Sequence, residues 1–419
     1  MNMELSQYEV DVLRRLAERQ AEIAALPIHN EKANLWQKLN DLEMIRPMVW
    51  INEIPWHEMN VNDELTLLTA NPWAREIEQQ LQRLLYQWNH MPADMIIEDY
   101  ISCPLIIHST GYGMAEDVDI VKTDETSDVV SRRFHSQIKE TQDIEKIKLP
   151  QVSYDKRSTE DNFQSMCEIF DGILPVKKVG KKYIWFAPWD ELIRWWGVQE
   201  TMTALVDNPQ LVNEIYSRLV DAYLFELDQW DALHLLSLNS DNTRIGSGGY
   251  GYTDDLPGKD FDPTHLHPAN MWGSGTAQIF SAVSPRMHWE FALRHEMRWL
   301  ERWGLTYYGC CEPLDMKMGI LHRIPNLRKI SMSPLVEIDR AVNEVQADYV
   351  FSRKPSPAAF AWDNWEPDAM RQDLRDFLEQ SHGCQIEIIM KDVSTVRYQP
   401  QRLWEWEKMA MELVEDYVQ

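Results

Sequence analysis

The chain has 419 residues, of which 44% are hydrophobic, and carries a formal net charge of −26. This acidic balance argues against sequence-independent binding to nucleic acid, which needs positive charge to neutralise phosphates. No apolar stretch approaches the roughly 18 uninterrupted residues that span a bilayer, and the first residues lack the basic and then apolar pattern of a signal peptide. We therefore expect a cytoplasmic protein with neither a nucleic-acid nor a membrane partner.

The N-terminal part shows the spacing of amphipathic helices over residues 4–25 and about 31–44, and Pro27 ends the first of them. We expect a helical extension over residues 1–44, which is a possible contact in a homo-oligomer. The rest of the chain, residues 45–419, is then a single larger domain.

Beyond residue 44, short apolar runs alternate with amphipathic helices, a pattern typical of parallel βα units. About eight such units fit a closed barrel better than an open sheet. The sequence therefore predicts an α/β fold, a (β/α)8 TIM barrel. The expected strands are 46–53, 101–108, 183–187, 234–238, 304–308, 328–332, 348–351 and 385–390, and the main helices are 209–231, 285–303, 336–345 and 367–380.

Two stretches interrupt this alternation. Residues 116–164 are charged and rich in Thr, Ser and Asp, and residues 246–267 are rich in glycine. Each is either a lid or an inert surface loop. His265 and His267, in the second stretch, have the His-x-His pattern of a metal pair, although an ordinary loop between prolines explains them more simply.

Polar residues gather where the expected strands end, which is where barrel enzymes place their active sites. Glu53 follows the first strand, and Asn239 and Asp241 follow the fourth, where they either hold substrate polar groups or close an Asx turn. Trp50 and His57, near the first strand, are further candidates for substrate contact. Tryptophans in a large barrel more often belong to the core.

Only five cysteines occur, too few for a disulfide framework in a chain of this length, so we expect reduced thiols. Cys310 and Cys311 are adjacent, and Glu312 follows them at the end of an expected strand. Thiols beside a carboxylate suggest a soft metal site, most plausibly zinc, whose remaining ligands come from elsewhere. The alternative is a thiol buried in the core. Tyr308, next to the thiols, is a candidate to donate to a leaving oxygen.

Several stretches resemble the uroporphyrinogen decarboxylase superfamily, which includes cobalamin-linked methyltransferases. The likeness covers most of residues 45–395 and implies a (β/α)8 barrel, in agreement with the strand pattern. The stretches are Arg46-Pro47-Met48-Val49-Trp50, Phe186-Ala187-Pro188-Trp189, Asp207-Asn208-Pro209 and Val283-Ser284-Pro285.

The decarboxylase itself is a poor match. Its arginine-bearing loop after the first strand is replaced here by a stretch that contains Glu53 and Glu58. Two carboxylates would repel a polycarboxylate porphyrinogen in a desolvated cleft, so we exclude that substrate.

The methyltransferase branch matches better. Its zinc motif is His-x-Cys followed, after a long gap, by a final Cys, and Cys311 and Cys384 lie 73 positions apart at the matching places. The position of the motif's His holds Tyr308 or Gly309, whereas a His-x-Cys occurs later as His382-Gly383-Cys384. The resemblance thus implies zinc on Cys311, His382 and Cys384, with Cys310 or Glu312 joining or substituting.

These observations predict a zinc-dependent methyltransferase. It would move a methyl group between a small donor, a methoxylated aromatic or a methylated amine, and a corrinoid (cobalamin) that a separate partner protein carries. A neutral donor needs a proton, for which Glu53, Glu58, His57 and Glu312 are candidates. The alternatives are a cofactor-independent decarboxylase of a small carboxylate, and a non-catalytic barrel that binds a ligand or a corrinoid partner.

Overall fold

The computed structural model describes residues 5–122, 130–259 and 261–417. Residues 1–4, on which part of the signal-peptide argument depends, and residues 123–129 of the first interrupting stretch lie outside the described residues. No helix in the described part of the chain is both long enough and apolar enough to cross a membrane.

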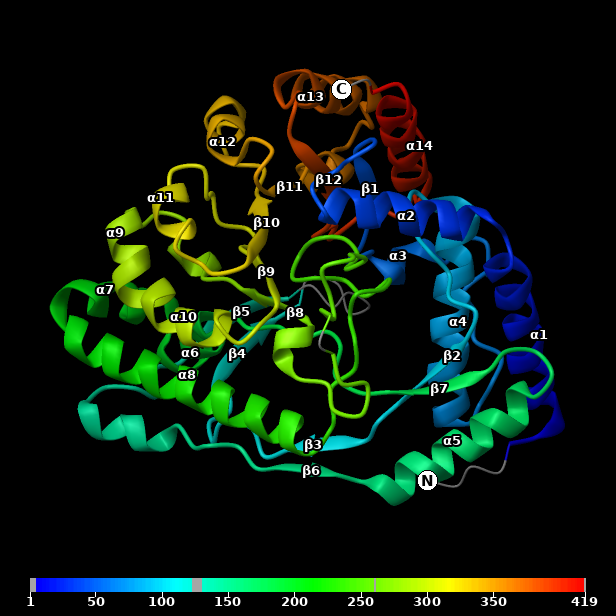
Figure 1. The fold of residues 1–419 in the computed structure, drawn as a ribbon, viewed down its shortest axis with the longest axis horizontal. Coiled ribbons are helices and arrows are strands. Elements are labelled where there is room, and N and C mark those ends of the chain that lie inside the picture. The colour runs from blue at the N-terminus through cyan, green and yellow to red at the C-terminus, as the bar shows by residue number, and fades with distance from the viewer. Residues whose placement is uncertain (1–4, 123–129, 260, 418–419) are drawn as a thin grey trace.

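The centre of the fold is a parallel sheet of six strands, in the order β1-β12-β11-β10-β9-β8 (Figure 1). Nearly every position in these strands is buried, as expected for parallel strands covered on both faces. The strands are β1 (Met48–Ile51), β8 (Trp272–Gly275), β9 (Leu305–Tyr308), β10 (Leu327–Met332), β11 (Val350–Arg353) and β12 (Gln385–Met390).

The helices that follow these strands cover the outer side of the sheet, so that α12, α13 and α14 lie outside β10, β11, β12 and β1 (Figure 1). The expected helices at 209–231, 336–345 and 367–380 are confirmed within two residues at each end. The helix expected at 285–303 ends three residues early and contains a π-helical turn, Trp289–Leu293. The helices from residue 209 onward are α8 (Pro209–Ala232), α9 (Pro285–His288), α10 (Arg294–Leu300), α11 (Met318–Leu321), α12 (Ile338–Val345), α13 (Pro367–Gln380) and α14 (Gln401–Glu415).

Three of the expected strands are wrong. The stretch 101–108 divides into β2 (Ile101–Pro104) and β3 (Ile107–Ser109), which pair outside the main sheet. Residues 183–187 form no strand, and 234–238 contributes only a bridge from Leu236 to Lys181. Strand β8 was missed because its glycines weaken the apolar pattern that marks a buried strand.

The remaining short strands form two-stranded pairs: β2 with β7 (Val176–Val179), β3 with β6 (Val152–Tyr154), and β4 (Val118–Val121) with β5 (Ser131–Phe134). Among the described strand ladders none joins β1 to β8, so the pairing shows a parallel α/β sheet of six strands and does not show a closed barrel.

The N-terminal residues form two helices that pack into the rest of the fold. Helix α1 (Gln7–Ala24), which begins with a capping box at Ser6, packs on α4 (Pro72–His90) and α5 (Lys156–Phe170) around a second small core. Helix α2 (Ile28–Asn40) contacts β1 and β12, and its Trp36 is fully buried.

The glycine-rich stretch that begins at Gly246 is neither a lid nor a surface loop in its first part. Its residues are buried against the main sheet, and Ile245 packs on Trp272 and Tyr307. A Cβ at Gly249 would lie 2.4 Å from the Trp36 ring, so only glycine fits there without displacement. The loop therefore fills space beside the strands of the main sheet.

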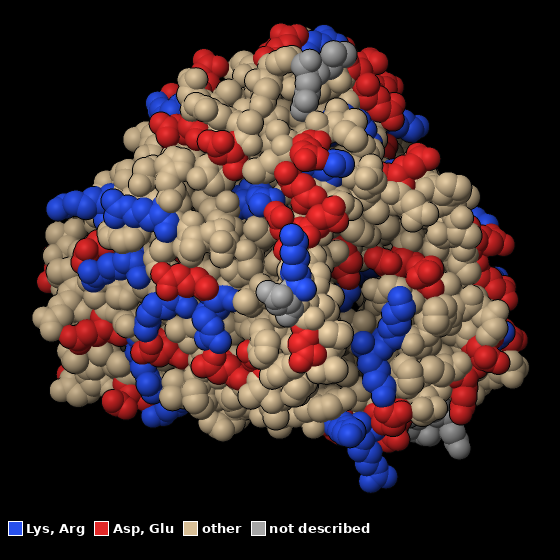
Figure 2. All heavy atoms as spheres, viewed as in Figure 1, with Lys and Arg blue, Asp and Glu red and all other residues tan. Residues whose placement is uncertain are grey.

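The charges of the protein are mixed on its surface. On the face in Figure 2, Lys and Arg side chains lie among Asp and Glu side chains. The net charge of −26 therefore does not give that face a single sign.

Candidate active site

The carboxyl ends of β1, β9 and β12 bring titratable side chains from distant parts of the sequence together. The Lys391 ammonium, just after β12, lies 3.3 Å from the Cys310 sulfur and 3.8 Å from the Cys311 sulfur, just after β9. It also lies 2.7 Å from an Asp392 oxygen and 3.6 Å from a Glu53 oxygen. Because the strands are parallel, their carboxyl ends meet at one edge of the sheet.

The turn after β9 depends on Gly309, whose φ of +100° suits glycine. It leaves Cys310 buried and Cys311 exposed, with 3.5 Å between the two sulfurs. The hydrogen bond with Cys311 and the nearby Lys391 ammonium lower the pKa of Cys310, whereas the same thiol contact raises the pKa of Cys311. The pair therefore favours a thiolate on Cys310 and a protonated thiol on Cys311.

Burial disfavours the charge on Lys391, but Cys310, Glu53 and Asp392 outweigh it and raise the pKa of the ammonium. Lys391 thus stays positive beside the sulfur. A fixed positive charge at this distance is the arrangement that stabilises thiolates in reactive cysteines.

Glu53 lies where the sequence predicted it, after β1, and its contacts are ion pairs and a backbone hydrogen bond. An oxygen of Glu53 lies 2.6 Å from Arg244, and the other accepts a hydrogen bond from the Asp392 backbone at 3.2 Å. With Lys391 nearby as well, this carboxylate contacts two cationic side chains. Glu53 and Asp392 both have positive φ, 54° and 57°, a strained backbone conformation that is frequent at functional sites.

A buried polar network lies beside this cluster, on the inner side of the sheet. Tyr307 accepts a hydrogen bond from Lys354 at 2.8 Å, and its hydroxyl lies 2.9 Å from that of Ser247. Burial lowers the pKa of Lys354 to about 7. The buried Glu387 carboxylate accepts hydrogen bonds from the Ser352 hydroxyl and the Lys329 ammonium, so it has a cationic partner.

Tyr308 does not reach the site, contrary to its expected role. Successive strand residues point to opposite faces, and Tyr307 takes the inner one. Tyr308 instead donates to Glu296 at 2.8 Å and contacts His288 at 2.8 Å, beneath the covering helices.

Glu312 is fully buried and stabilises the turn rather than facing a substrate. It accepts from the Cys310 backbone at 2.8 Å, from the Thr276 hydroxyl at 2.9 Å and from the Ala277 backbone at 3.2 Å. These bonds hold the thiol turn against the end of β8.

Cys384 and His382 are not near the other thiols. Cys384 immediately precedes β12, whereas Lys391 immediately follows it, so the length of a six-residue strand, roughly 20 Å, separates the two ends. Cys384 is buried in the main core, and burial raises the pKa of its thiol to about 11. The set of Cys310, Cys311, His382 and Cys384 is therefore wrong as a single metal site.

Three other residues that were expected to contact substrate contact neighbouring protein groups instead. Asn239 is buried and donates to the Lys182 and Trp272 carbonyls, and Asp241 pairs with Lys182. Trp50 packs with its ring centroid 4.9 Å from that of Tyr250. Asn239 and Trp50 thus have packing roles.

His57 lines a cavity of about 540 Å³ whose walls include neither Cys310, Cys311 nor Lys391. Glu53 contributes to the same wall, so the cavity reaches the charged group described above. A volume of this size suits a small organic molecule. Other lining residues are Trp56, Leu65, Gln82, Arg83 and Val393.

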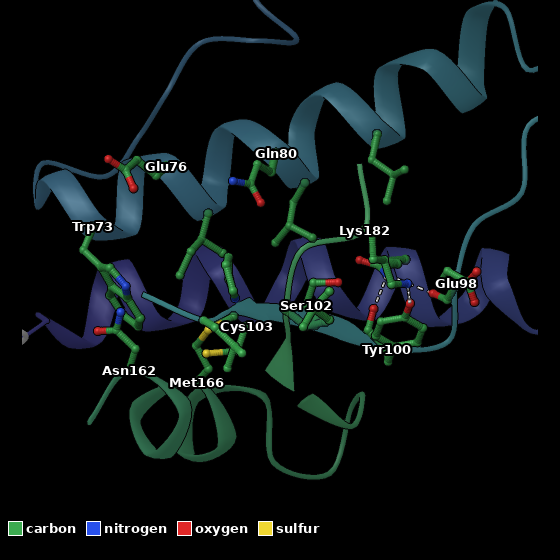
Figure 3. Close-up of a pocket in the computed structure, with 18 of the residues that line it drawn as sticks. Trp73, Glu76, Gln80, Glu98, Tyr100, Ser102, Cys103, Asn162, Met166 and Lys182 are labelled. Carbon is green, nitrogen blue, oxygen red and sulfur yellow. Dashed lines mark hydrogen bonds between the residues drawn. The ribbon is translucent and has the colours of Figure 1, made fainter. Parts of the chain in front are cut away.

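A second cavity, of about 470 Å³, lies between α4, α5 and β2 (Figure 3). Tyr100 and Lys182 face one another at one end, 3.5 Å apart, Trp73 and Asn162 lie at the other, and Cys103 and Met166 lie between. Its walls include none of the residues around Cys310, so it is a separate hollow.

The sequence argument missed Lys391, Asp392, Arg244 and Lys354 as site residues. Lys391 and Asp392 had a usable signal, because they follow the last expected strand directly. Lys354 follows β11 in the same manner. Arg244 had none, since it reaches Glu53 from the buried loop before Gly246.

No protein-family model and no curated protein matches the sequence. Among solved structures, the fold is similar to that of a methyltransferase from Methanosarcina mazei, with a TM-score of 0.52 and 9% sequence identity. The match covers 91% of this chain and 98% of the methyltransferase. The two chains share a fold.

Zinc, which the family resemblance implies, does not fit the residues as they lie. Cys310, Cys311 and Asp392 are donors of suitable chemistry, but the Lys391 ammonium already lies among them. In the described part of the chain, three potential ligand atoms lie within 4.8 Å of one another only at Asp231, His265 and His267.

Proposed function

We propose that this protein is a methyltransferase of the uroporphyrinogen decarboxylase-like superfamily, and that Cys310 carries the methyl group. The observation that carries the proposal is the 3.3 Å contact between the Cys310 sulfur and Lys391, next to a cavity that Glu53 lines. The fold shared with a methyltransferase supports it.

The proposal includes the (β/α)8 barrel. Two irregular segments would complete it between β8 and β1: residues 180–184 and 235–239. Their support is the parallel bridge between Lys181 and Leu236, and the contacts of Asn239 with Lys182 and Trp272.

In the first half-reaction the Cys310 thiolate attacks the methyl carbon of a methoxylated aromatic or a methylated amine. The C–S bond forms as the bond from methyl to oxygen or nitrogen breaks, and the electron pair stays on the leaving atom. The Cys311 thiol gives its proton to that atom, so a neutral product leaves and the negative charge moves to Cys311. Lys391 lies close enough to both sulfurs to stabilise either thiolate.

In the second half-reaction the Cys310 thioether gives its methyl group to a reduced corrinoid on a separate protein. The electron pair of the acceptor's low-valent cobalt would form the new bond to the methyl carbon as the C–S bond breaks, the C–S electron pair would return to Cys310 as a thiolate, and the Cys311 thiolate would regain a proton from solvent. Zinc remains a prediction of the family resemblance, and its binding at the thiols would require Lys391 to move away.

The test is an anaerobic assay with free cob(I)alamin as acceptor and guaiacol or trimethylamine as donor. The spectral change to methylcob(III)alamin reports transfer. We expect Cys310→Ser to lose transfer by orders of magnitude, whereas Cys384→Ser, a buried thiol away from the site, retains it. Equal activity of Cys310→Ser and wild type would reject the proposed role.

A second candidate is the cofactor-independent decarboxylase. The cations Arg244 and Lys391 beside the cavity favour it, since a carboxylate substrate needs positive charge. Release of CO2 from a small carboxylate without corrinoid, with no methyl transfer, would support this candidate instead.

A further inference from the structure

A cluster of imidazoles lies around one carboxylate, apart from the thiol cluster. Asp231 lies near the end of α8, and His265 and His267 lie in the loop that leads to β8. One Asp231 oxygen is 3.0 Å from His265 Nε2 and 2.9 Å from His267 Nδ1. His234 lies beside them, its ring centroid 3.9 Å from that of His265.

We propose that Asp231, His265 and His267 bind one divalent transition-metal ion, and that Zn²⁺ is the best match. Imidazole nitrogen and carboxylate oxygen are ligands that zinc takes, and the three ligand atoms already lie within 4.8 Å of one another. This inference is independent of the proposed methyl transfer.

The surroundings favour a cation at this point. The carboxyl end of α8, a helix of 24 residues, carries the negative end of the helix dipole. The Asp231 carbonyl also faces the site and lies 3.1 Å from His265 Nε2.

The loop orients His267 before any ion binds. Asn270 accepts a hydrogen bond from the His267 backbone at 3.0 Å and donates to the Pro257 carbonyl at 2.9 Å. The side chains of Asp231, His265 and His267 are 17%, 30% and 50% exposed, so an ion can enter from solvent and water can complete its coordination.

The function of the ion would be to fasten the loop to α8. The loop around His265 leads directly into β8, whose far end is held to the thiol turn through Glu312 and Thr276. A metal at this point would therefore stabilise the fold rather than take part in the reaction.

The test measures Zn²⁺ by elemental analysis after the full-length protein is loaded with zinc and dialysed. We expect one equivalent in wild type, and its loss in Asp231→Asn and His267→Asn. The matched control His322→Asn changes an exposed histidine on another helix end and should keep the ion. Cys310→Ser should keep it too, which separates this site from one at the thiols.

A second measurement keeps the proposal testable if a variant folds poorly. Zn²⁺ should raise the melting temperature of wild type and His322→Asn, but not that of His267→Asn. Co²⁺ bound in place of zinc should show a four- or five-coordinate visible spectrum without sulfur-to-metal charge transfer. No bound ion in wild type, an ion retained by both ligand variants, or charge transfer from sulfur would overturn the proposal.

Discussion

The Cys310 sulfur and the Lys391 ammonium lie 3.3 Å apart although 81 positions separate them in the sequence. Parallel pairing of β9 with β10, β10 with β11 and β11 with β12 brings their two loops to one edge. The contact is therefore a product of the sheet, and the chemistry proposed for this protein depends on it.

Lys391→Met should raise the pKa of the Cys310 thiol, because it removes the positive charge that stabilises the thiolate. In wild type, modification of Cys310 by methyl methanethiosulfonate should rise at a pH below the ordinary cysteine range. In Lys391→Met the rise should move to higher pH. Lys391→Arg keeps a positive charge, so its rise should lie close to that of wild type. Peptide mass spectrometry locates the label, and identical profiles for wild type and Lys391→Met would contradict the ion pair.

Glu296→Gln should change how stability depends on pH. Burial raises the pKa of Glu296 to about 7 from a usual 4.5, so the folded state holds a proton that the unfolded state releases between those values. The free energy of unfolding should therefore fall by about 3 kcal/mol as pH rises from 4.5 to 7, and this group should add no further change above pH 7. Urea unfolding at several pH values should show this fall in wild type and a flatter profile in Glu296→Gln. Parallel profiles would refute the assignment.

Arg46→Met should destabilise the protein by about 3–5 kcal/mol, because it leaves the Asp94 carboxylate buried without its charged partner. Arg46 contacts the two oxygens of Asp94 at 2.9 and 2.6 Å, and Asp94 is fully buried. Arg15→Met, at an exposed position of α1, is the control and should have little effect. Chemical unfolding measures both, and similar midpoints would show that the pair is not needed.

Gly249→Ala should destabilise the buried loop by about 1–3 kcal/mol through overpacking, because its Cβ would meet the Trp36 ring and Glu387. Gly319→Ala is the matched control, since nothing lies within 4 Å of a Cβ there. Thermal unfolding should separate the two variants. Equal stability would mean that the loop can withdraw from the sheet.

The alternation of strands and helices in the C-terminal half could be predicted from the sequence, because stretches such as Gln385–Met390 are rich in β-branched and apolar residues and are followed by polar residues. The alternation between β1 and α8 could not be predicted. Pro104 and the exposed residues of β3 interrupt the apolar run that suggested one strand over 101–108. Whether β1 and β8 close into a barrel depends on irregular segments that have no sequence period.

Some residues of the candidate site could be placed from the sequence and others could not. Glu53, Cys310 and Cys311 could be placed because each follows a strand at its carboxyl end. Cys384 was misplaced because its assignment followed the motif spacing of the resemblance, although the expected strand 385–390 already put Cys384 before the start of a strand. The choice between Tyr307 and Tyr308 depends on which face of β9 each occupies, and two adjacent tyrosines give no pattern that decides it.

The most direct test of the account is anaerobic incubation of the protein with methylcob(III)alamin, followed by peptide mass spectrometry. The reverse half-reaction should add one methyl group to Cys310 and release cob(I)alamin, with no methyl on Cys384 and no cob(I)alamin from Cys310→Ser. Release of cob(I)alamin that persists in Cys310→Ser, or the absence of both methylation and release in wild type, would contradict the claim that Cys310 carries the methyl group.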